Sequence, residues 1–265
     1  MKTEFRALKR FGQNFLINPY ISERIVRALT IESQDFILEI GPGKGALSAL
    51  IVNKKPARFI AVEIDRLLAA NLQKQYAEKM EIINDDFLNI ELNRYGQCLK
   101  IVGNIPYNIT TPIIFKMIEE RQVVKEALIM MQKEVARRLS ADISENKEYG
   151  ILSVLCQTYA HIDYLFDVKR GNFLPTPKVD SAVVKFVFKN TLDGLKDENL
   201  FKKIVRATFN YRRKTLKNSL GRIFDKTIVY SIDEFDLTKR PENLTPQQFI
   251  QLSNTIYDKL RNLHD

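Results

Sequence analysis

The stretch Asp35-Phe-Ile-Leu-Glu-Ile-Gly-Pro-Gly-Lys-Gly45 joins an apolar run to a glycine-rich turn. The apolar run over 35–40 is typical of a buried strand. Glycines at alternate positions allow a tight turn and let a ligand approach the backbone closely. A helix predicted over about 45–53 follows, and its first N–H groups are available to a ligand. The stretch therefore predicts the strand, loop and helix that begin a nucleotide-binding α/β fold.

Short apolar segments alternate with helical patterns on both sides of this stretch. The predicted strands are Asp35–Ile40, Arg58–Val62, Met80–Asn84, Leu99–Val102 and Ala127–Met131. Helices are predicted around 45–53, 66–78 and 111–120, the last with a cap at Thr110 or Thr111, and an earlier helix runs from Asn18-Pro19 to about Leu29. Such alternation predicts a mostly parallel sheet covered by helices on both faces.

The pattern changes after a further strand predicted at Ser181–Phe188. The segment Leu192–Glu198 is polar and contains a glycine, which indicates a domain boundary near residue 190. Helices are predicted beyond it, over roughly 198–209, 211–222 and 245–261. We therefore expect an α/β domain over 1–189, with a basic N-terminal arm, and a small helical domain over 190–265.

Composition excludes several classes of protein. The 265 residues include 41 Lys and Arg against 32 Asp and Glu, and the net charge of +9 favours a polyanionic partner such as nucleic acid. No apolar run approaches the roughly 18 residues of a membrane span, and the N-terminus lacks the apolar core of a secretory signal. Cys98 and Cys156 lack CxxC spacing, and His161 and His264 are the only histidines. We therefore expect a cytoplasmic protein without a metal site, a disulfide scaffold or a membrane span.

Two acidic residues follow the second and third predicted strands. Glu63 stands 20 residues after Gly43, where a carboxylate can accept both hydroxyls of a ribose. Asp86 follows the third strand, where it can bind the exocyclic amine of an adenine. Because Gly41-x-Gly43-x-x-Ala46 also fits the dinucleotide fingerprint, NAD and S-adenosylmethionine are both candidates at this point. The alternative is a strand-to-helix turn that merely requires glycine.

The fourth predicted strand ends in Asn104-Ile105-Pro106-Tyr107, which favours methyl transfer to an amine. The lone pair of an adenine amine is delocalised into the ring, so the amine is a poor nucleophile. Two acceptors on its N–H bonds, the Asn104 side-chain oxygen and the Ile105 carbonyl, can stabilise the positive charge that develops on the nitrogen. Pro106 restricts the preceding residue to an extended conformation, and Tyr107 can stack on the purine. Asn and Pro are also ordinary turn residues, but here they follow a glycine loop and two acidic strand ends.

Motifs along nearly the whole chain then indicate a family. They are Arg10-Phe-Gly-Gln-Asn-Phe-Leu16, Glu39-Ile-Gly-Pro-Gly43, Glu63-Ile-Asp65, Asp86, Gly103-Asn-Ile-Pro-Tyr-Asn-Ile109, Phe173-Leu-Pro-Thr-Pro-Lys-Val-Asp-Ser-Ala182, Arg212-Arg-Lys-Thr-Leu-Lys-Asn-Ser-Leu220 and Arg240-Pro-Glu-Asn-Leu244. With them the chain resembles the bacterial ribosomal RNA small-subunit adenine dimethyltransferases (the KsgA group), which are class I, Rossmann-like S-adenosylmethionine enzymes with a helical C-terminal domain. The macrolide-resistance methyltransferases of 23S rRNA are related alternatives, but they typically have Ser in place of Pro42 and lack the 212–220 segment.

The resemblance implies the cofactor, the substrate and the site. S-adenosyl-L-methionine would be bound by Asn14, Leu16, Gly41, Gly43, Glu63, Asp86 and Asn104, with Asp85 as an alternative to Asp86. The catalytic residues would be Asn104, Ile105, Pro106 and Tyr107, with Phe173 against the other face of a flipped adenine. The implied substrate is a pair of adjacent adenosines in a hairpin loop near the 3′ end of 16S rRNA, in the small ribosomal subunit or its precursor. The implied product is N6,N6-dimethyladenosine, and the implied enzyme is a monomer that also acts in small-subunit biogenesis.

Basic residues predict an RNA-binding surface. The candidates are Arg206, Arg212, Arg213, Lys214, Lys217 and Arg222, together with Arg10 in the N-terminal arm. On one continuous helix, Arg213 and Lys217 would share a face. The alternative for this cluster is an ordinary solvated surface. The cluster also motivates a hypothesis from a different class, a ribosome-assembly factor whose catalysis is secondary. An NAD-dependent oxidoreductase rests on the glycine fingerprint alone.

Overall fold

The computed structural model of the chain describes residues 13–144, 147–192 and 194–262. It divides into two compact units. One ends at Ala136 and includes Ile162–Asn190, and the other contains Arg137–His161 and continues from Thr191. The first unit holds nearly all of the sheet, and the second is mainly helical. The predicted division of the chain at residue 190 into catalytic and RNA-binding domains stays a prediction.

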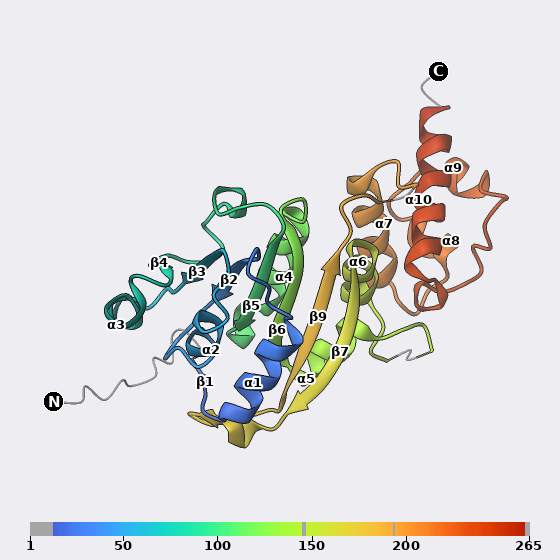
Figure 1. The fold of residues 1–265 in the computed structure, drawn as a ribbon. Helices are drawn as coiled ribbons and strands as arrows, with labels where there is room; N and C mark the ends of the chain where they lie inside the picture. The colour runs from blue at the N-terminus through green and yellow to red at the C-terminus, as the bar shows by residue number, and fades with distance from the viewer. Residues whose placement is uncertain (1–12, 145–146, 193, 263–265) are drawn as a thin grey trace. The chain divides into compact units, whose positions relative to one another are not determined.

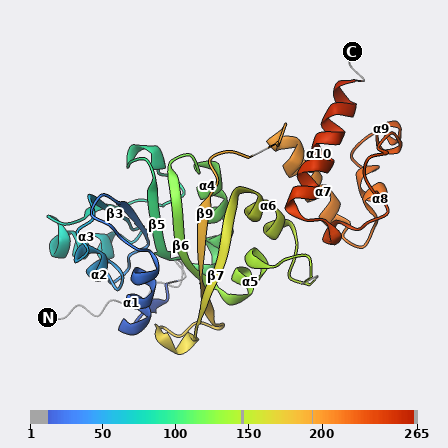
Figure 2. The same cartoon turned by 45° about the vertical axis from the view of Figure 1, so that its right-hand side comes forward.

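A seven-stranded sheet forms the framework of the first unit (Figure 1). Its order is β4 (Glu81–Ile83), β3 (Arg58–Val62), β2 (Phe36–Ile40), β5 (Leu99–Asn104), β6 (Val124–Gln132), β9 (Ser181–Phe188) and β7 (Ala160–Val168). The strands from β4 to β6 pair in parallel, and β9 pairs antiparallel with β6. Figure 2 shows β6, β9 and β7 side by side at this end of the sheet. The predicted mostly parallel α/β sheet is confirmed, whereas β7 was not predicted.

The strand order reverses at β2, which has β3 on one side and β5 on the other. Ile40 at the end of β2 pairs with Val62 and with Gly103, and Val62 pairs with Ile83. The carboxyl ends of these four strands therefore lie level at one edge of the sheet. Open α/β sheets bind ligands in the crevice at such an edge, where the strand order reverses.

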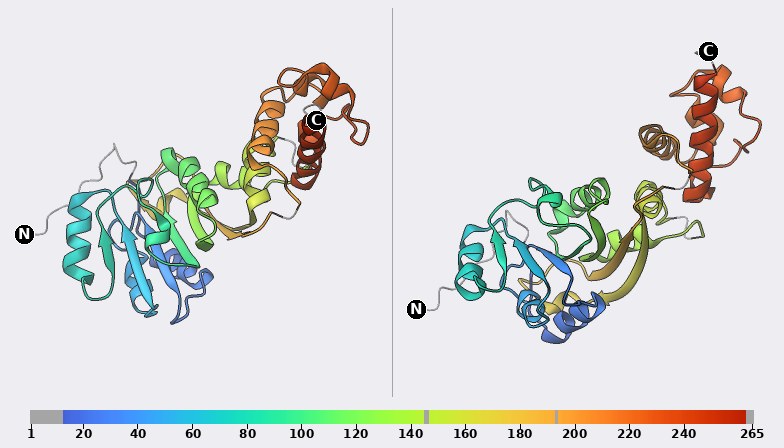
Figure 3. Two further views of the ribbon diagram at one scale, coloured as in Figure 1. Left: turned by 90° about the horizontal axis from the view of Figure 1, so that it is seen from above. Right: turned by 45° about the horizontal axis from the view of Figure 1, so that its top comes forward.

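Helices cover both faces of the sheet. Helices α1 (Pro19–Ala28), α2 (Ser48–Val52) and α3 (Arg66–Tyr76) lie on one face, and α4 (Thr110–Glu119) lies on the opposite face (Figure 3). Ile37, Phe59 and Val102 share a core with Ile25 of α1 and Ile51 of α2. Because side chains alternate along a strand, the neighbouring strand residues are directed to the α4 face.

Two short strands add a second sheet beside this framework. Strand β1 (Phe15–Leu16) pairs antiparallel with β8 (Phe173–Leu174), and Leu16 stands opposite Phe173. The side chain of Asn18 caps α1 by accepting a hydrogen bond from the Tyr20 amide at 3.0 Å, as its sequence predicts. Helix α4, by contrast, has Ile109 at its cap position, and the Thr110 hydroxyl donates to the Pro106 carbonyl instead. The predicted threonine cap of α4 is therefore wrong.

The second unit is built from five helices among the described residues. They are α6 (Ile151–Tyr159), α7 (Glu198–Asn210), α8 (Leu216–Leu220), α9 (Lys226–Tyr230) and α10 (Pro246–Arg261). Helix α5 (Lys133–Ser140) follows β6 and continues into this unit. The rings of Phe209 and Phe249 lie 5.8 Å apart in the core, and the Tyr149 hydroxyl donates to the Leu244 carbonyl at 2.7 Å. None of the helices in the described part of the chain is both long and apolar enough to cross a membrane.

The helix predicted over 211–222 is wrong in its extent. Helix α7 ends at Asn210, and the chain turns through 211–214 before α8 begins at Leu216. Thr215 has an extended backbone, and its hydroxyl accepts from the Asn218 amide, so it caps a new short helix. Arg213 lies in the turn and Lys217 in α8, so the two do not share the face of one helix.

Candidate active site

One cavity lies at the level strand ends and is lined by the loops that follow β2, β3, β4 and β5, together with the segment around β1. It brings together nearly all the predicted cofactor-binding and catalytic residues, which are Asn14, Leu16, Gly41, Gly43, Glu63, Asp86, Asn104, Ile105, Pro106 and Tyr107. The cavity belongs entirely to the first unit. Residues far apart in the sequence thus meet where the fold favours ligand binding.

The glycine loop has the left-handed backbone that its sequence predicts. Gly41 and Gly43 have φ angles of +60° and +59°, which residues with a side chain adopt only with strain. A Cβ on Gly41 would meet nothing within 4 Å, so the backbone borders open space there. A Cβ on Gly43 would stand 3.0 Å from a ring carbon of Phe15, so this glycine allows β1 to pack closely on the loop.

Glu63 is a buried carboxylate at the end of β3, with 4% of its surface exposed. Its two oxygens accept hydrogen bonds from the backbone amides of Gly43 and Asp65, each at 2.9 Å. Burial raises the pKa of Glu63, although both amide hydrogen bonds favour its charged form. A carboxylate oxygen can accept more than one hydrogen bond, so Glu63 retains capacity for the hydroxyls of a ribose.

Glu39 is a second buried carboxylate on the cavity lining, and it was not among the site residues predicted from the sequence. The Ser48 hydroxyl donates to it at 2.6 Å. Burial raises the pKa of Glu39 to about 8, and the neighbouring charge of Glu63 acts in the same direction. The sequence signal that could have identified Glu39 is a glutamate inside the otherwise apolar strand Phe36–Ile40.

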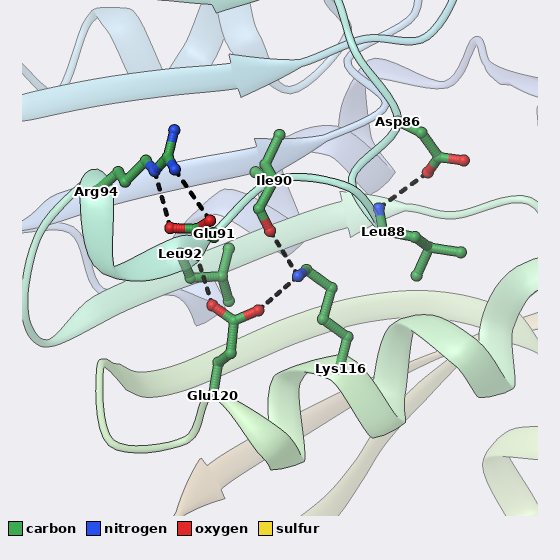
Figure 4. Close-up of polar contacts among 8 residues, drawn as sticks. All are labelled: Asp86, Leu88, Ile90, Glu91, Leu92, Arg94, Lys116 and Glu120. Atoms are coloured by element: carbon green, nitrogen blue, oxygen red, sulfur yellow. Dashed lines mark hydrogen bonds and ion pairs between the residues drawn. The ribbon is translucent and has the colours of Figure 1, made fainter.

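Asp85 and Asp86 both line the cavity, and they differ in exposure. Asp86 is half-buried and Asp85 is exposed. One oxygen of Asp86 accepts from the Leu88 amide at 2.9 Å, as Figure 4 shows. One oxygen of Asp85 accepts from the Asp86 amide at 2.7 Å. In the described part of the chain the second oxygen of each carboxylate has no hydrogen-bond partner, so it is the lower exposure of Asp86 that favours it over Asp85 for the adenine-binding role.

The tetrapeptide after β5 holds its polar groups in defined positions. The Asn104 side-chain amide donates to the backbone carbonyl of Asn14 at 2.8 Å, and the Ile105 amide donates to the Met130 carbonyl at 3.2 Å. Among the described residues, no hydrogen bond uses the Ile105 carbonyl oxygen. The half-buried Tyr107 shares a hydrogen bond with the Ser181 hydroxyl at 2.8 Å, and burial raises the pKa of its phenol.

Phe173 stands apart from the other predicted catalytic residues. It has 2% of its surface exposed, belongs to the core of the sheet unit, and is absent from the cavity lining. Its backbone pairs with Leu16, which does line the cavity. Phe173 is thus one strand removed from the site, and its contact with a flipped base stays a prediction.

The predicted RNA-binding residues lie in the second unit, apart from Arg10, which is outside the described residues. Those with exposed side chains are Arg206, Arg213, Lys214, Lys217 and Arg222. Arg212 instead pairs with Glu242 at 2.6 Å. The Lys217 ammonium lies 4.4 Å from the centre of the Tyr230 ring, and the Arg222 guanidinium lies 4.5 Å from that of Tyr211. A basic surface with interleaved aromatic rings suits nucleic acid, and this role stays a prediction.

Comparison with known proteins identifies the family. The family model described as Ribosomal RNA adenine dimethylase matches residues 4–258. A curated relative from Chlorobium phaeobacteroides (strain BS1), Ribosomal RNA small subunit methyltransferase A, is 44% identical over 99% of this chain and 97% of its own length. A crystal structure of a dimethyladenosine transferase from Plasmodium falciparum has a TM-score of 0.83 and 27% identity over 92% of this chain and 98% of that one.

A crystal structure of the 23S rRNA methyltransferase ErmE has a TM-score of 0.71 and 24% identity, over 92% of this chain and 100% of that one. This likeness supports the same fold and no finer statement. The near full-length match to the family model and the 44% identity to a curated relative favour the adenine dimethyltransferase family, which the sequence motifs had indicated, over an NAD-dependent oxidoreductase. The chain therefore belongs to the ribosomal RNA adenine dimethylase family.

Proposed function

We propose that this protein transfers methyl groups from S-adenosyl-L-methionine to N6 of two adjacent adenosines in 16S rRNA, giving N6,N6-dimethyladenosine. The target is the hairpin loop near the 3′ end of that RNA, in the small ribosomal subunit or its precursor. The relative named Ribosomal RNA small subunit methyltransferase A supports this choice of subunit, because it covers nearly the whole chain. The protein acts as a cytoplasmic monomer in small-subunit biogenesis.

The residues of the cavity fit the cofactor of this family. Gly41 borders open space, and Glu63 is a buried carboxylate with acceptor capacity left for ribose hydroxyls. Asp86 has an oxygen for the adenine amine, and Asn14, Leu16 and the rest of the glycine loop complete the wall. S-adenosylmethionine supplies the methyl group as an electrophilic carbon bonded to a positively charged sulfur. The apolar side chains of the lining would shield that carbon from water.

The hydrogen bond between Asn104 and Asn14 is the observation that carries the mechanism. Because the Asn104 Nδ2 donates to the Asn14 carbonyl, the Asn104 Oδ1 is the atom left to accept a hydrogen bond in the cavity. The Ile105 carbonyl, held in place by the bond of its amide to Met130, supplies a second acceptor. The two acceptors bind the N–H groups of the substrate amine and stabilise the positive charge that the nitrogen gains.

Tyr107 orients the base. Its hydroxyl is fixed by Ser181 on β9, which holds the ring where a flipped adenine can stack on it. Extruding a base costs a few kcal/mol, and the cost is lower for an unpaired loop adenosine. Once the methylated nitrogen has released one proton to solvent, one N–H remains on the amine, so one acceptor contact persists for the second transfer.

The test replaces Asn104 with Ala and uses Asn108→Ala as the control. Asn108 is an exposed asparagine of the same loop and is absent from the cavity lining. We expect Asn104→Ala to lower methyl transfer to precursor small subunits by about 100-fold or more, with a much smaller loss of cofactor affinity. The control should keep wild-type activity. Undiminished transfer by the Asn104→Ala protein would refute the role of this side chain.

The exposed basic residues of the second unit favour a second candidate function, in which binding to the precursor subunit matters apart from catalysis. A Glu63→Ala protein, deprived of the ribose-binding carboxylate, would then still associate with precursor particles and support their maturation. Loss of particle binding in that variant would count against this second function.

A further inference from the structure

The loop after β4 contributes a wall of the cavity and is attached to α4 by two side chains. It covers residues 84–94, including the short helix Leu92–Arg94 at its end, and Asp85, Asp86 and Phe87 line the cavity. Helix α4 begins at Thr110, three residues after Tyr107, and is joined to the tetrapeptide by the short helix Tyr107–Ile109. Figure 4 shows the two segments side by side, with Lys116 and Glu120 reaching from the end of α4 to the loop.

These two side chains form hydrogen bonds with one backbone carbonyl and one backbone amide of the loop. The Lys116 ammonium donates to the Ile90 carbonyl at 2.6 Å and to Glu120 Oε1 at 2.5 Å. The other oxygen of Glu120 accepts from the Leu92 amide at 2.6 Å. The ion pair between Lys116 of α4 and Glu120, the residue that caps the end of α4, thus holds a carbonyl and an amide two residues apart in the loop.

The surroundings make this attachment stronger than an ordinary surface ion pair. The side chains of Lys116 and Glu120 have 14% and 27% of their surface exposed. The exposed fractions for Arg94 and Glu91, an ion pair in the same loop, are 68% and 61%. Hydrogen bonds to charged groups shielded from water are stronger than neutral ones, and removing one partner leaves the other unpaired. The Lys116 ammonium also lies 5.9 Å from the centre of the Phe87 ring, where a cation–π attraction acts.

Apolar burial fixes the depth of the loop but not the direction of its carboxylate. Phe87, Ile90 and Leu92 are buried, and non-directional contacts of this kind tolerate small sliding movements. The two bonds from α4 are directional, and they act within six residues of Asp86. A shift of the loop along α4 would move the Asp86 carboxylate relative to the tetrapeptide at the other end of the same helix.

We propose that Lys116 and Glu120 are positioning residues that hold the Asp86 loop in register with α4, and so set the distance between the adenine-binding carboxylate and the catalytic tetrapeptide. The proposal rests on the proposed function, because it takes Asp86 as the group that binds the adenine amine of the cofactor. It predicts that these two residues act on cofactor binding through Asp86 and not on the methyl-transfer step itself.

The experiment measures binding of S-adenosylhomocysteine, and of its analogue without the adenine amine, by calorimetry. We expect Lys116→Met to weaken the binding of S-adenosylhomocysteine by about tenfold, the loss typical of one charge-assisted hydrogen bond. The affinity for the analogue should not change. In steady-state assays the KM for S-adenosylmethionine should rise by a similar factor while kcat stays within about twofold. Adding Lys116→Met to Asp86→Asn should lower the affinity for S-adenosylhomocysteine little further than Asp86→Asn alone does.

Matched variants keep the proposal falsifiable. Glu91→Gln and Arg94→Gln remove the exposed ion pair of the same loop and should not change the affinity for either ligand. Lys116→Arg should restore most of the affinity, and Glu120→Gln provides a milder variant, because its amide oxygen still accepts from Leu92 but no longer pairs with the ammonium. Equal weakening of both ligands, or a fall in kcat at constant KM, would overturn the proposal. A failure of the proposed function is distinct, because the wild-type protein itself would then neither bind S-adenosylhomocysteine nor methylate precursor subunits.

Discussion

Replacing Glu39 with Gln tests the charge of the buried carboxylate beside the cavity. Burial raises the pKa of Glu39 from 4.5 to about 8 in the folded protein, and the Ser48 hydrogen bond only partly opposes this. In the unfolded chain the carboxyl loses its proton near pH 4.5, so between pH 4.5 and about 8 the folded state holds one more proton than the unfolded state. Rising pH therefore removes stability, by about 1.4 kcal/mol per pH unit across this window. The whole interval corresponds to about 5 kcal/mol of lost stability above pH 8.

Glu39→Gln removes this titration, while its amide oxygen can still accept a hydrogen bond from Ser48. We expect the variant and the wild-type protein to have similar free energies of unfolding near pH 5. By pH 8.5 the variant should be more stable by several kcal/mol, on the order of 3–5. Because the chain contains no tryptophan, urea unfolding is best followed by far-ultraviolet circular dichroism, at intervals from pH 5 to 9. Ser48→Ala is the control, since losing that hydrogen bond should extend the titration to higher pH. Parallel stability curves for Glu39→Gln and wild type would refute the reasoning.

Three further predictions concern the loop, the base and the RNA. Gly43→Ala should lower the thermal unfolding temperature more than Gly41→Ala, because both positions have φ near +60° but only at Gly43 would the new Cβ lie 3.0 Å from a ring carbon of β1; the reverse order would contradict the packing argument. Tyr107→Phe loses the Ser181 hydrogen bond that fixes the ring and should lower kcat/KM by no more than about threefold, whereas Tyr107→Ala loses the stacking ring itself and should lower kcat/KM by about tenfold or more; equal losses would indicate that the hydroxyl bond matters as much as the ring. Arg213→Gln combined with Lys217→Gln should weaken binding to small-subunit particles and lower the slope of log affinity against log salt by about 1.5, as expected when two phosphate contacts are lost; an unchanged slope would show that neither side chain meets RNA.

The central strands could be predicted because each is buried on both faces. Strands β2, β3 and β5 are nearly continuous runs of apolar residues bounded by turn residues, a pattern typical of parallel strands. Strand β7 escaped prediction because it lies at the edge of the sheet, and most of its residues are only half-buried or exposed. The break between α7 and α8 was not predicted for another reason. The residue types from 211 to 222 are compatible with a helix, and only the extended backbone at Thr215 interrupts it.

The position of the site could be predicted, but not all of its contacts. Glu63 and Asp86 follow strands, and Asn104 ends one, and the ends of these strands lie level in the parallel sheet, so their meeting follows from the fold. Glu39 was not predicted as a site residue. The sequence shows a charged residue inside an apolar strand, but only the packing around it shows that the carboxylate is excluded from solvent. The 2% exposure of Phe173 depends on the pairing of β1 with β8, two strands too short to carry a sequence pattern.

Two contacts between distant segments set the orientation of groups in the proposed site. An asparagine side chain has a donor and an acceptor that differ little in shape, so the tetrapeptide alone does not determine which of them faces the substrate. The Asn14 carbonyl, 90 residues away in the sequence, decides it by taking the donor. The Lys116 and Glu120 pair likewise attaches the wall that carries Asp86 to the helix that follows the tetrapeptide. Groups that bind a ligand must be held within about 0.5 Å of the productive geometry, and a loop edge alone does not provide that accuracy. The strand ends therefore bring the proposed site residues to one place, and these hydrogen bonds between distant segments orient the Asn104 acceptor and hold the Asp86 loop.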